Sequence, residues 1–521
     1  MSFHQAVRVV TLILTVAFIL TVLVQGWGLL SANAFWVDEV FTTYMMYAFG
    51  NFERWVLGYL IEDPHPPIYP LLVYPIAKIF GYSETVMRLP SFTFILISGA
   101  LIYRMCAWLY GRSIGLGALV VFLALWPSVF NSQEARDYSL LIVMTSFALP
   151  VGLRLSRAIA NDEGVTVQFW PVTVILIALN YTSYFGSFMS AAILTLPLVV
   201  AIHRRHWRAC GVVVFHGLVS LAAFLPWVAL NATVMSKRGA IAQNHERFGF
   251  HTPDLTFVFD EVPNYLLGPN AGTFLVMVGV IALGGLLITK FANPPRGGDD
   301  GPSSGPVTGL DYAYFAVVIV IAIAIPVVIS LQFPIVMARH LVGVTPALAI
   351  LVTIIALGPW RRRASSAVLA VIMLGFVNHT LSVADIRASD LKVDIDVAAD
   401  YLLERRKDGE PILIYCYHYP QRRCDSEPPH SFLGRYIHYL NRATLPATPI
   451  LPEYFVDEKG PEDASARAAA YRAAKTPVVF LYGIKANADK LVLAREALTF
   501  EGYICESHLF HRARVEECRL G

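Results

Sequence analysis

The ionisable residues of this chain gather in a few short segments, each at the edge of a long apolar run. The segments are WVDE, EDPHPPIY, NSQEARDYSL and ARHLVGVTP. Carboxylates in such places can act as general bases, histidine can bind a metal, and arginine is suited to an anionic phosphate. Because ionisable groups beside membrane helices are costly to desolvate, their gathering predicts a functional site.

The first segment places Asp38 and Glu39 side by side. Adjacent residues cannot both point into one site, so we expect one of the two to be the working group and the other to be structural. The plainer alternative is that both are solvated loop acids, or acids in the first turn of a helix, where they are favoured by the helix dipole.

The second segment holds Asp63 and His65 among three prolines. Proline fixes φ and removes an amide donor, so the two residues should lie on a stiff turn. Such a turn suits metal or phosphate binding, and Asp63 and His65 are candidate metal ligands. The alternative is that the prolines only end a loop and start a surface helix.

The third segment brings Gln133, Glu134, Arg136 and Asp137 within five residues. An arginine and an acid at a helix start are a common structural device, but four polar groups exceed what capping needs. We therefore expect Glu134 and Asp137 to be candidate catalytic acids and Arg136 to be a candidate for substrate binding.

Basic residues supply the remaining candidates. Arg339 and His340 open a late apolar run. An arginine at the outer end of a span needs a partner, and an anionic phosphate is a good one; snorkelling to the interface is the alternative. Arg247 lies in a loop polar enough to be ordinary, so it ranks below the others.

Composition defines the class of protein. Of 521 residues, 56% are hydrophobic and 15% are charged, and the mean hydropathy is +0.56, which is too apolar for an ordinary soluble domain. The formal net charge is only +2, so there is no basic excess to attract nucleic acid. The chain is expected to be a polytopic membrane protein that does not bind nucleic acid.

Apolar segments predict about eleven membrane spans. They fall near residues 7–30, 88–109, 113–130, 138–156, 168–183, 184–202, 207–230, 264–290, 310–331, 341–358 and 364–384. The first is long enough to span and is expected to stay attached, although Ala32 and Ala34 form a cleavage pattern. Residues 66–80 are short for a span and are expected to form a helix on the membrane surface.

The positive-inside rule orients these spans. With a cytoplasmic N-terminus, the basic loops YGRS, HRRHWR and PWRRR are all cytoplasmic. A twelfth span at residues 66–80 would move two of them outside. The eleven-span topology therefore places all the candidate site segments, and the tail from about residue 385, on the non-cytoplasmic face.

The tail predicts a second domain. Residues 385–521 alternate helix-like stretches with short apolar strands, which is typical of a small α/β domain. Four cysteines there, Cys416, Cys424, Cys505 and Cys518, would allow two disulfides in an oxidising compartment, or would be buried thiols. We therefore expect a transmembrane domain at 1–384 and an extracytoplasmic domain at 385–521.

Taken together, the motifs WVDE, HPPIY, GYSETVMRLPS, SQEARDYSL and ARHLVGVTP resemble those of the GT-C fold of polyprenyl-phosphate-dependent glycosyltransferases. The branch with the strongest resemblance holds the protein O-mannosyltransferases and the lipid A aminoarabinose transferase. The likeness lies in the order of the motifs along the chain and in their expected location on the same side of the membrane. Many relatives have Arg-Tyr where this chain has Arg339-His340, and this difference bears on substrate choice.

The resemblance implies roles for the candidate residues. Asp38 falls on the catalytic base of the family, and the second outer acid falls on either Glu134 or Asp137. Arg339 falls on the arginine near the lipid phosphate, helped by His65, Arg247 or a divalent metal ion. In the same scheme Glu39, Arg136 and His340 line the substrate site. Attack opposite the leaving phosphate implies inversion at the anomeric carbon.

The function expected from this resemblance is transfer of a hexose or pentose from a polyprenyl-phosphate sugar to a glycan, lipid or protein acceptor. A bacterial inner membrane with a periplasmic site is the expected location. The alternatives are a transporter or flippase for a lipid-linked sugar and a non-catalytic assembly partner. A transporter should carry charges within several spans and show inverted repeats, and neither is evident in the sequence.

Overall fold

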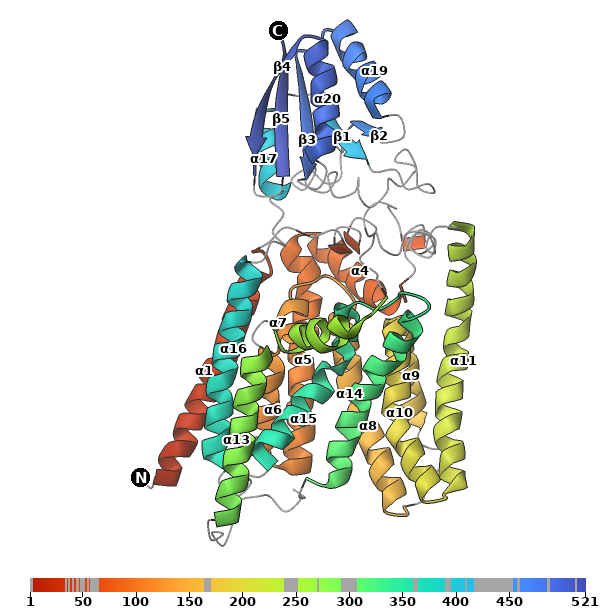
Figure 1. The fold of residues 1–521 in the computed structure, drawn as a ribbon, viewed down its shortest axis with the longest axis vertical. Helices are drawn as coiled ribbons and strands as arrows, with labels where there is room; N and C mark the ends of the chain where they lie inside the picture. Colours follow the sequence, from red (N-terminus) through yellow and green to blue (C-terminus); the bar gives the residue numbers. More distant parts are fainter. Residues whose placement is uncertain are drawn as a thin grey trace.

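The computed structural model contains a helical bundle below a small sheet domain (Figure 1). It describes residues 3–32, 35, 38–39, 42–43, 46, 52–53, 56, 65–163, 170–238, 252–268, 271–291, 307–358, 364–388, 395–407, 410–416, 453–456, 460–484, 488–510 and 513–521.

The bundle consists of helices in the order in which the apolar segments predict them. They are α1 (Phe3–Leu29), α4 (Ile68–Phe80), α5 (Glu84–Tyr110), α6 (Arg112–Ala124), α7 (Trp126–Asn131), α8 (Tyr138–Ala160), α9 (Trp170–Thr182), α10 (Tyr184–His203), α11 (Trp207–Arg238), α12 (Val262–Leu267), α13 (Ala271–Phe291), α14 (Gly309–Ser330), α15 (Thr345–Leu357) and α16 (Ala364–Ala388). Within the described residues, eight helices are long and apolar enough to cross a membrane. The chain is therefore an integral membrane protein.

Two of the predicted spans are interrupted. The segment 113–130 divides into α6 and α7 at Leu125, whose backbone is extended (ψ 139°), and Pro127 follows without an amide donor for the helix. The segment 264–290 divides into α12 and α13 at Gly268, whose φ of +89° only glycine adopts readily. Both interruptions shorten a helix near the end of the bundle that faces the sheet domain.

The helix α4 agrees with the prediction of a surface helix. It has 13 residues, about 20 Å of helix, which is too short to cross a bilayer core of about 30 Å. Tyr69, Val73 and Ala77 are buried on one face, whereas Ile79 and Phe80 are exposed. The buried residues recur every four positions, as expected for a helix with one face against the bundle.

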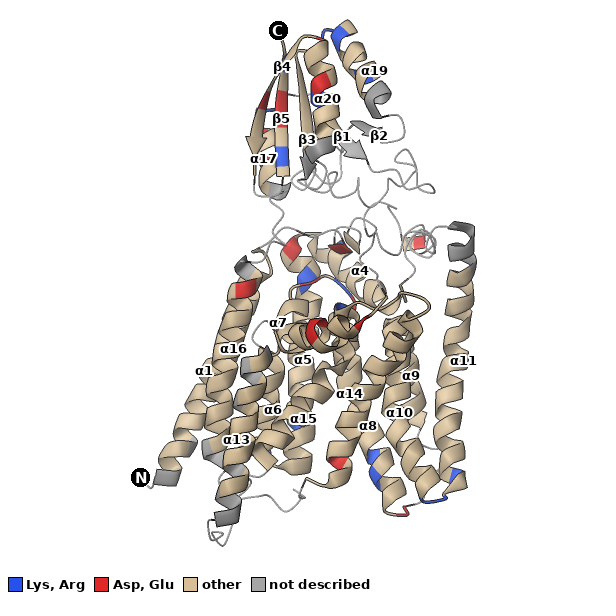
Figure 2. Ribbon diagram, in the orientation of Figure 1, with Lys and Arg blue, Asp and Glu red and all other residues tan. Residues whose placement is uncertain are grey.

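Charge follows the same layering. Figure 2 shows Lys, Arg, Asp and Glu mainly at the two ends of the bundle, with the helices between them mostly uncharged. At the end remote from the sheet domain, Trp170 and Trp207 are exposed, as in the aromatic belts at membrane interfaces. The polar segments of interest lie at the opposite end.

The C-terminal domain is a mixed sheet with helices on both faces. It contains α17 (Ile395–Arg405), β1 (Ile412–Cys416), β2 (Glu453–Val456), α19 (Gly460–Ala473), β3 (Val478–Ile484), α20 (Ala488–Phe500), β4 (Tyr503–Leu509) and β5 (Ala513–Leu520). The strand order is β2-β1-β3-β5-β4, with β2, β1 and β3 parallel and β5 antiparallel to both β3 and β4. The prediction of a small α/β domain is confirmed.

The burial pattern of β3 explains why both faces are covered. Val479 and Leu481 pack with residues of α19 and α20, whereas Phe480 and Tyr482 pack with residues of α17. Side chains alternate between the two faces of a strand, so an uninterrupted apolar run requires a helix on each side. The predicted boundary at 384/385 falls in the last turn of α16 and stays a prediction.

One disulfide lies within the described residues. Cys505 of β4 and Cys518 of β5 are cross-strand partners and form it. This agrees with an oxidising environment for the domain. Cys424 lies outside the described residues, so the pairing of Cys416 is left as a prediction.

At the other end of the bundle, Asp311 forms a buried junction between α8 and α14. Its Oδ2 accepts hydrogen bonds from the amide and hydroxyl of Thr308 at 2.8 and 2.9 Å. Its Oδ1 accepts from Nε and Nη2 of Arg157 at 3.0 and 2.7 Å. Asp311 is 0% exposed, so its charge depends on these donors.

We predict that Asp311→Asn destabilises the bundle by roughly 2–3 kcal/mol, because a buried ion pair loses one charge while Arg157 keeps some access to water. Denaturant titration in detergent measures this. The matched control is Asp162→Asn, which removes the exposed ion pair with His206 at 2.7 Å and should change the free energy of unfolding by less than about 0.5 kcal/mol. Equal effects of the two variants would contradict the view that the buried ion pair of Asp311 stabilises the bundle.

Candidate active site

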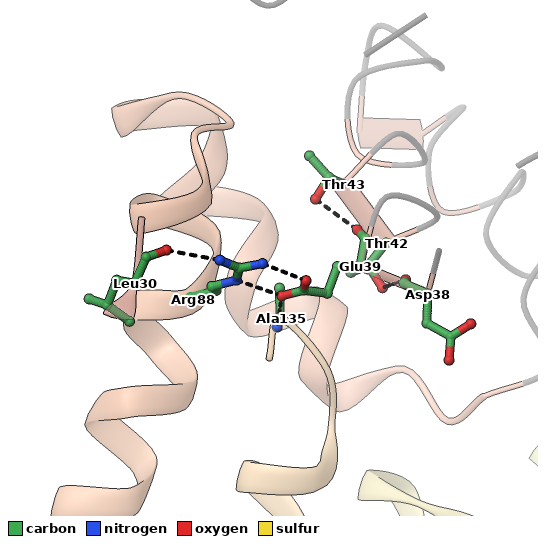
Figure 3. A network of polar contacts seen from close by, with 7 residues as sticks. All are labelled: Leu30, Asp38, Glu39, Thr42, Thr43, Arg88 and Ala135. Carbon is green, nitrogen blue, oxygen red and sulfur yellow. Dashed lines mark hydrogen bonds and ion pairs between the residues drawn. The ribbon is translucent and has the colours of Figure 1, made fainter. Parts of the chain in front are cut away.

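The adjacent acids Asp38 and Glu39 point in different directions (Figure 3). Glu39 is 1% exposed and accepts hydrogen bonds from Nε and Nη2 of Arg88 at 2.8 and 2.7 Å. Its Oε1 also accepts the amide of Ala135 at 2.9 Å. Both oxygens of Glu39 are therefore engaged, and its placement favours a structural role over the predicted contact with substrate.

Arg88 extends this network to the end of α1. It is 3% exposed and donates from Nη1 to the carbonyl of Leu30 at 3.1 Å. One ion pair thus ties together α1, the segment with Asp38, the start of α5 and the loop before α8. Arg88 is not among the residues predicted for the site, although it begins a predicted span on the outer side, which is also the position that favoured Arg339.

Asp38 faces Arg339, an arginine from a distant part of the sequence. Its Oδ2 lies 3.6 Å from Nη2 of Arg339, and the two side chains are 31% and 28% exposed. Arg339 lies in the short 3₁₀ turn Ala338–Val344 that precedes α15. An accessible carboxylate beside a partly exposed guanidinium is suited to take a proton next to a bound anion.

Arg136 connects the loop before α8 with the two earlier segments. Its Nη1 donates to the hydroxyl of Thr42 at 3.2 Å, and its Nη2 lies 3.3 Å from Nε2 of His65. A guanidinium can only donate, so Nε2 of His65 accepts in this contact and the proton of the neutral ring is on Nδ1. Arg136 and His65, each predicted separately as a candidate for substrate binding, are therefore in contact.

The same contact bears on the predicted metal. Bound through Nε2 of His65, a divalent ion would have to displace the Arg136 guanidinium, so this arrangement does not fit metal binding at that atom. The other predicted ligand, Asp63, lies outside the described residues. The described Cys505, Glu516 and Cys518 have ligand atoms close together, but the two sulfurs are already bonded to each other.

Glu134 is the buried acid of the cluster. It is 5% exposed, and within the described residues its Oε2 has no hydrogen-bond partner. Burial raises the pKa of Glu134 to about 8, the negative charges of Glu39 and Asp38 also raise it, and Arg339 and Arg136 oppose them. Glu134 is therefore mostly protonated at neutral pH.

The other candidates occupy supporting positions. Asp137 is 7% exposed and precedes α8 without capping it through its side chain. The Nδ1 of His340 accepts the amide of Met337 at 3.1 Å, and its ring lies 4.6 Å from that of Phe185. Asp137 therefore adjoins the cluster, whereas these contacts of His340 suit a structural role. Arg247 lies outside the described residues.

Tyr265 is a neighbour of the cluster that the sequence motifs do not indicate. It lies on α12 directly after the π-helical turn Phe257–Glu261, and its hydroxyl accepts from Nδ2 of Asn131 at 3.2 Å. Glu134 and Arg339 are among the charges that act on it. No motif marks a lone tyrosine after a polar loop, so sequence alone gave no signal for it.

Comparisons with known proteins bear on this arrangement. Residues 64–229 match the family model described as dolichyl-phosphate-mannose-protein mannosyltransferase. Among solved structures, the chain is similar to ArnT from Cupriavidus metallidurans, both bound to undecaprenyl phosphate and in the apo state. In each case the identity is 13%, the TM-score is 0.57, and the match covers 96% of this chain and 97% of that one.

A more distant match is the archaeal oligosaccharyltransferase AglB from Archaeoglobus fulgidus, with 10% identity, a TM-score of 0.41, and coverage of 97% of this chain and 73% of that one. A comparison with curated protein sequences gives no significant match. The predicted likeness to the GT-C glycosyltransferases of the ArnT and mannosyltransferase branch is confirmed, and the chain has the GT-C fold.

We predict that substitutions of Glu39 and of Asp38 lower the free energy of unfolding by different amounts. Glu39→Gln should destabilise the protein by roughly 3 kcal/mol, because it leaves the Arg88 guanidinium buried without a counter-charge. Asp38→Asn should cost less than about 1 kcal/mol, since its ion pair is partly solvated. Denaturant titration of both variants in detergent checks this, and a larger loss for Asp38→Asn would contradict it.

We also predict that Glu134→Gln becomes stabilising as the pH rises. The folded protein keeps Glu134 neutral up to a pKa of about 8, whereas an unfolded glutamate ionises near 4.3, so wild-type stability falls between these values. At pH 9 the variant should gain up to roughly 5 kcal/mol over wild type, and at pH 4 almost nothing. Thermal unfolding from pH 4 to 9 measures this difference. A pH-independent difference would show that Glu134 is ionised in the fold.

Proposed function

We propose that this chain transfers a sugar from a polyprenyl-phosphate donor to the hydroxyl of an acceptor on the non-cytoplasmic face of the membrane, with inversion at the anomeric carbon. The observation that carries the proposal is the accessible Asp38 carboxylate 3.6 Å from Arg339, in a chain with the fold of a transferase bound to undecaprenyl phosphate.

Asp38 acts as the general base. It takes the proton of the acceptor hydroxyl while the acceptor oxygen bonds to the anomeric carbon and the bond from that carbon to the phosphate oxygen breaks. The polyprenyl phosphate leaves with the electron pair of the broken bond. Before this step, the phosphate of the incoming donor binds next to Arg339. It releases Asp38 from its ion pair with Arg339, because the phosphate is the stronger partner of a guanidinium.

Positive charge from arginine stabilises the leaving phosphate. Arg339 and Arg136 lie around the acids, and a guanidinium donates two parallel hydrogen bonds to phosphate oxygens. Since Nε2 of His65 is taken by Arg136, the two arginines supply the charge that a divalent metal would otherwise supply. Arg247 remains a further candidate for the same role.

Glu134 is a better candidate than Asp137 for the second acid. Glu134 is buried, and its Oε2 has no hydrogen-bond partner in the described part of the chain, which suits a neutral carboxyl that donates a hydrogen bond to the sugar or the phosphate. An ionised acid at this place would repel the leaving phosphate, and keeping Glu134 protonated removes that repulsion. Asp137 then serves as a flanking acid.

The remaining parts of the proposal concern location and substrates. The segment 1–384 would be the transferase domain in a bacterial inner membrane, and the domain at 385–521 would lie over the site on the periplasmic side and contact the acceptor. The donor carries a hexose or a pentose, and the acceptor is a glycan, lipid or protein. A transporter is disfavoured by the gathering of charges at the ends of the bundle (Figure 2).

We predict that Asp38→Asn lowers the transfer rate about 100-fold or more, because the base is lost. Cells that lack the protein should accumulate one polyprenyl-phosphate sugar, and the Asp38→Asn gene should fail to clear it. Lipid mass spectrometry of the two strains, with wild-type rescue, measures this and names the donor.

The matched control is Asp162→Asn, the same chemical change at an exposed cytoplasmic position, which should clear the lipid as wild type does. Full rescue by Asp38→Asn would refute the assignment of the base. If the lipid instead accumulates on the cytoplasmic face and is missing from the outer face, the chain acts as a flippase.

A further inference from the structure

The segment that leads into the turn with Arg339 has no regular secondary structure. The helix α14 ends at Ser330, and the 3₁₀ turn that carries Arg339 begins at Ala338. Between them, residues 334–337 belong to no helix or strand, and Pro334 has no amide to donate. The backbone amides of this segment must therefore find acceptors outside a helix or a sheet.

Two side chains accept the amides of three consecutive residues in this segment. The Oγ of Ser330 accepts the amides of Ile335 and Val336 at 3.1 and 3.0 Å. The Nδ1 of His340 accepts the amide of Met337 at 3.1 Å. Ser330 is 0% exposed, so solvent does not compete for its hydroxyl. The course of the backbone here is therefore fixed by two side chains rather than by a regular ladder of hydrogen bonds.

The ring of His340 is itself held by its neighbours. It lies 4.6 Å from the ring of Phe185 on α10 and 6.4 Å from the ring of Tyr138 on α8. Its Nδ1 also lies 3.2 Å from the carbonyl of Ile335, so either neutral tautomer has a hydrogen-bond partner on the same segment. The amide of His340 in turn donates to the carbonyl of Met337 at 2.9 Å. The segment and the turn are therefore tied to each other and to the bundle.

Arg339 lies between these two anchors. Ser330 holds the chain before it, and His340, the next residue, holds the start of the turn. The guanidinium is attached more weakly, by a partly exposed ion pair with Asp38 at 3.6 Å. An arginine side chain has several rotatable bonds, and ordering it on a ligand costs free energy. A backbone that is already fixed lowers the total cost of binding an anion.

We propose that Ser330 and His340 are positioning residues for Arg339. By holding the segment before the 3₁₀ turn, they keep the guanidinium next to Asp38, where it receives the phosphate of the donor. In this assignment His340 acts through Arg339, which differs from its predicted place in the substrate site. The inference rests on the proposed function, since it concerns the phosphate that Arg339 would bind.

The first test measures the binding of undecaprenyl phosphate to the full chain by isothermal titration calorimetry in detergent, which requires no sugar transfer. His340→Phe keeps an aromatic ring against Phe185 but removes the Nδ1 acceptor. We expect about ten-fold weaker binding, the effect of roughly one lost hydrogen bond. Ser330→Ala should weaken binding to a similar extent. Unchanged affinity in both variants would overturn the proposal.

Two further substitutions distinguish the ring nitrogens of His340. The amide oxygen of asparagine lies near the place of Nδ1, so His340→Asn keeps an acceptor for Met337 and should restore most of the affinity. The longer side chain of glutamine carries its amide to the place of Nε2, so His340→Gln should bind as weakly as His340→Phe. The opposite order would show that His340 contacts the lipid phosphate through Nε2, and the positioning role would be wrong.

A double-mutant cycle tests whether the effect passes through Arg339. If His340 acts by placing the guanidinium, His340→Phe should have almost no further effect on binding in the background of Arg339→Gln. Two independent losses that multiply would contradict the proposal. The matched control is Ser156→Ala, because Ser156 is also 0% exposed but its hydroxyl donates to the carbonyl of Gly152 within α8. This variant should leave binding unchanged.

Transfer kinetics separate positioning from a loss of folded protein. With the donor that lipid mass spectrometry names, Ser330→Ala and His340→Phe should raise the KM for the donor about ten-fold and leave the KM for the acceptor unchanged. A defect in folding alone would reduce the active fraction and lower the apparent kcat, with both KM values unchanged. That second pattern would show that the two residues are only structural.

The proposal and the proposed function fail separately. If both variants weaken the binding of undecaprenyl phosphate while the wild type transfers no sugar, the proposed function is wrong and the positioning role stands for lipid binding. If the wild type transfers sugar but neither variant weakens binding, the positioning role is wrong and the proposed function is unaffected.

Discussion

The buried ion pair between Glu39 and Arg88 is the interaction on which the outer end of the bundle depends. Taking two charges out of water costs several kcal/mol for each ion. The cost is offset here because both oxygens of Glu39 and all three guanidinium nitrogens of Arg88 have hydrogen-bond partners. The pair joins four segments that are distant in the sequence. Because Glu39 turns toward Arg88, its neighbour Asp38 must turn toward the opposite side (Figure 3).

The acids of the cluster differ in environment, and that difference supports the separate roles proposed for them. Glu39 is buried and paired, and Asp38 is partly exposed beside Arg339. Glu134 is buried, and its Oε2 has no hydrogen-bond partner among the residues that the structure describes. A paired carboxylate holds structure, a buried unpaired one stays protonated, and an accessible one can accept a proton. Residue type alone does not distinguish them, since all three are carboxylic acids in polar segments next to apolar runs.

This explains how much the sequence could predict. Hydropathy is a sum over many residues, so it located the helices despite errors at single positions, and the described candidates lie at one end of the bundle. The adjacency of Asp38 and Glu39 predicted that one of the two acids would be structural. Which acid it is depends on Arg88, which lies 49 residues from Glu39 in the sequence. The breaks at Leu125 and Gly268 depend on local backbone conformation, which apolar periodicity does not contain.

The arrangement around Glu134 shows why a transferase would need so many structural contacts beside so few reacting groups. A carboxyl that stabilises a developing charge is effective only if it is held in place before the reaction, since reorientation during the reaction costs free energy. Glu134 lies between Gln133, held by the carbonyl of Gly26, and Ala135, held by Glu39. The loop is thereby fixed on both sides of Glu134. Asp38, by contrast, forms a longer and partly exposed ion pair with Arg339, and the proposed base, which would exchange that ion pair for an acceptor hydroxyl, benefits from the weaker attachment.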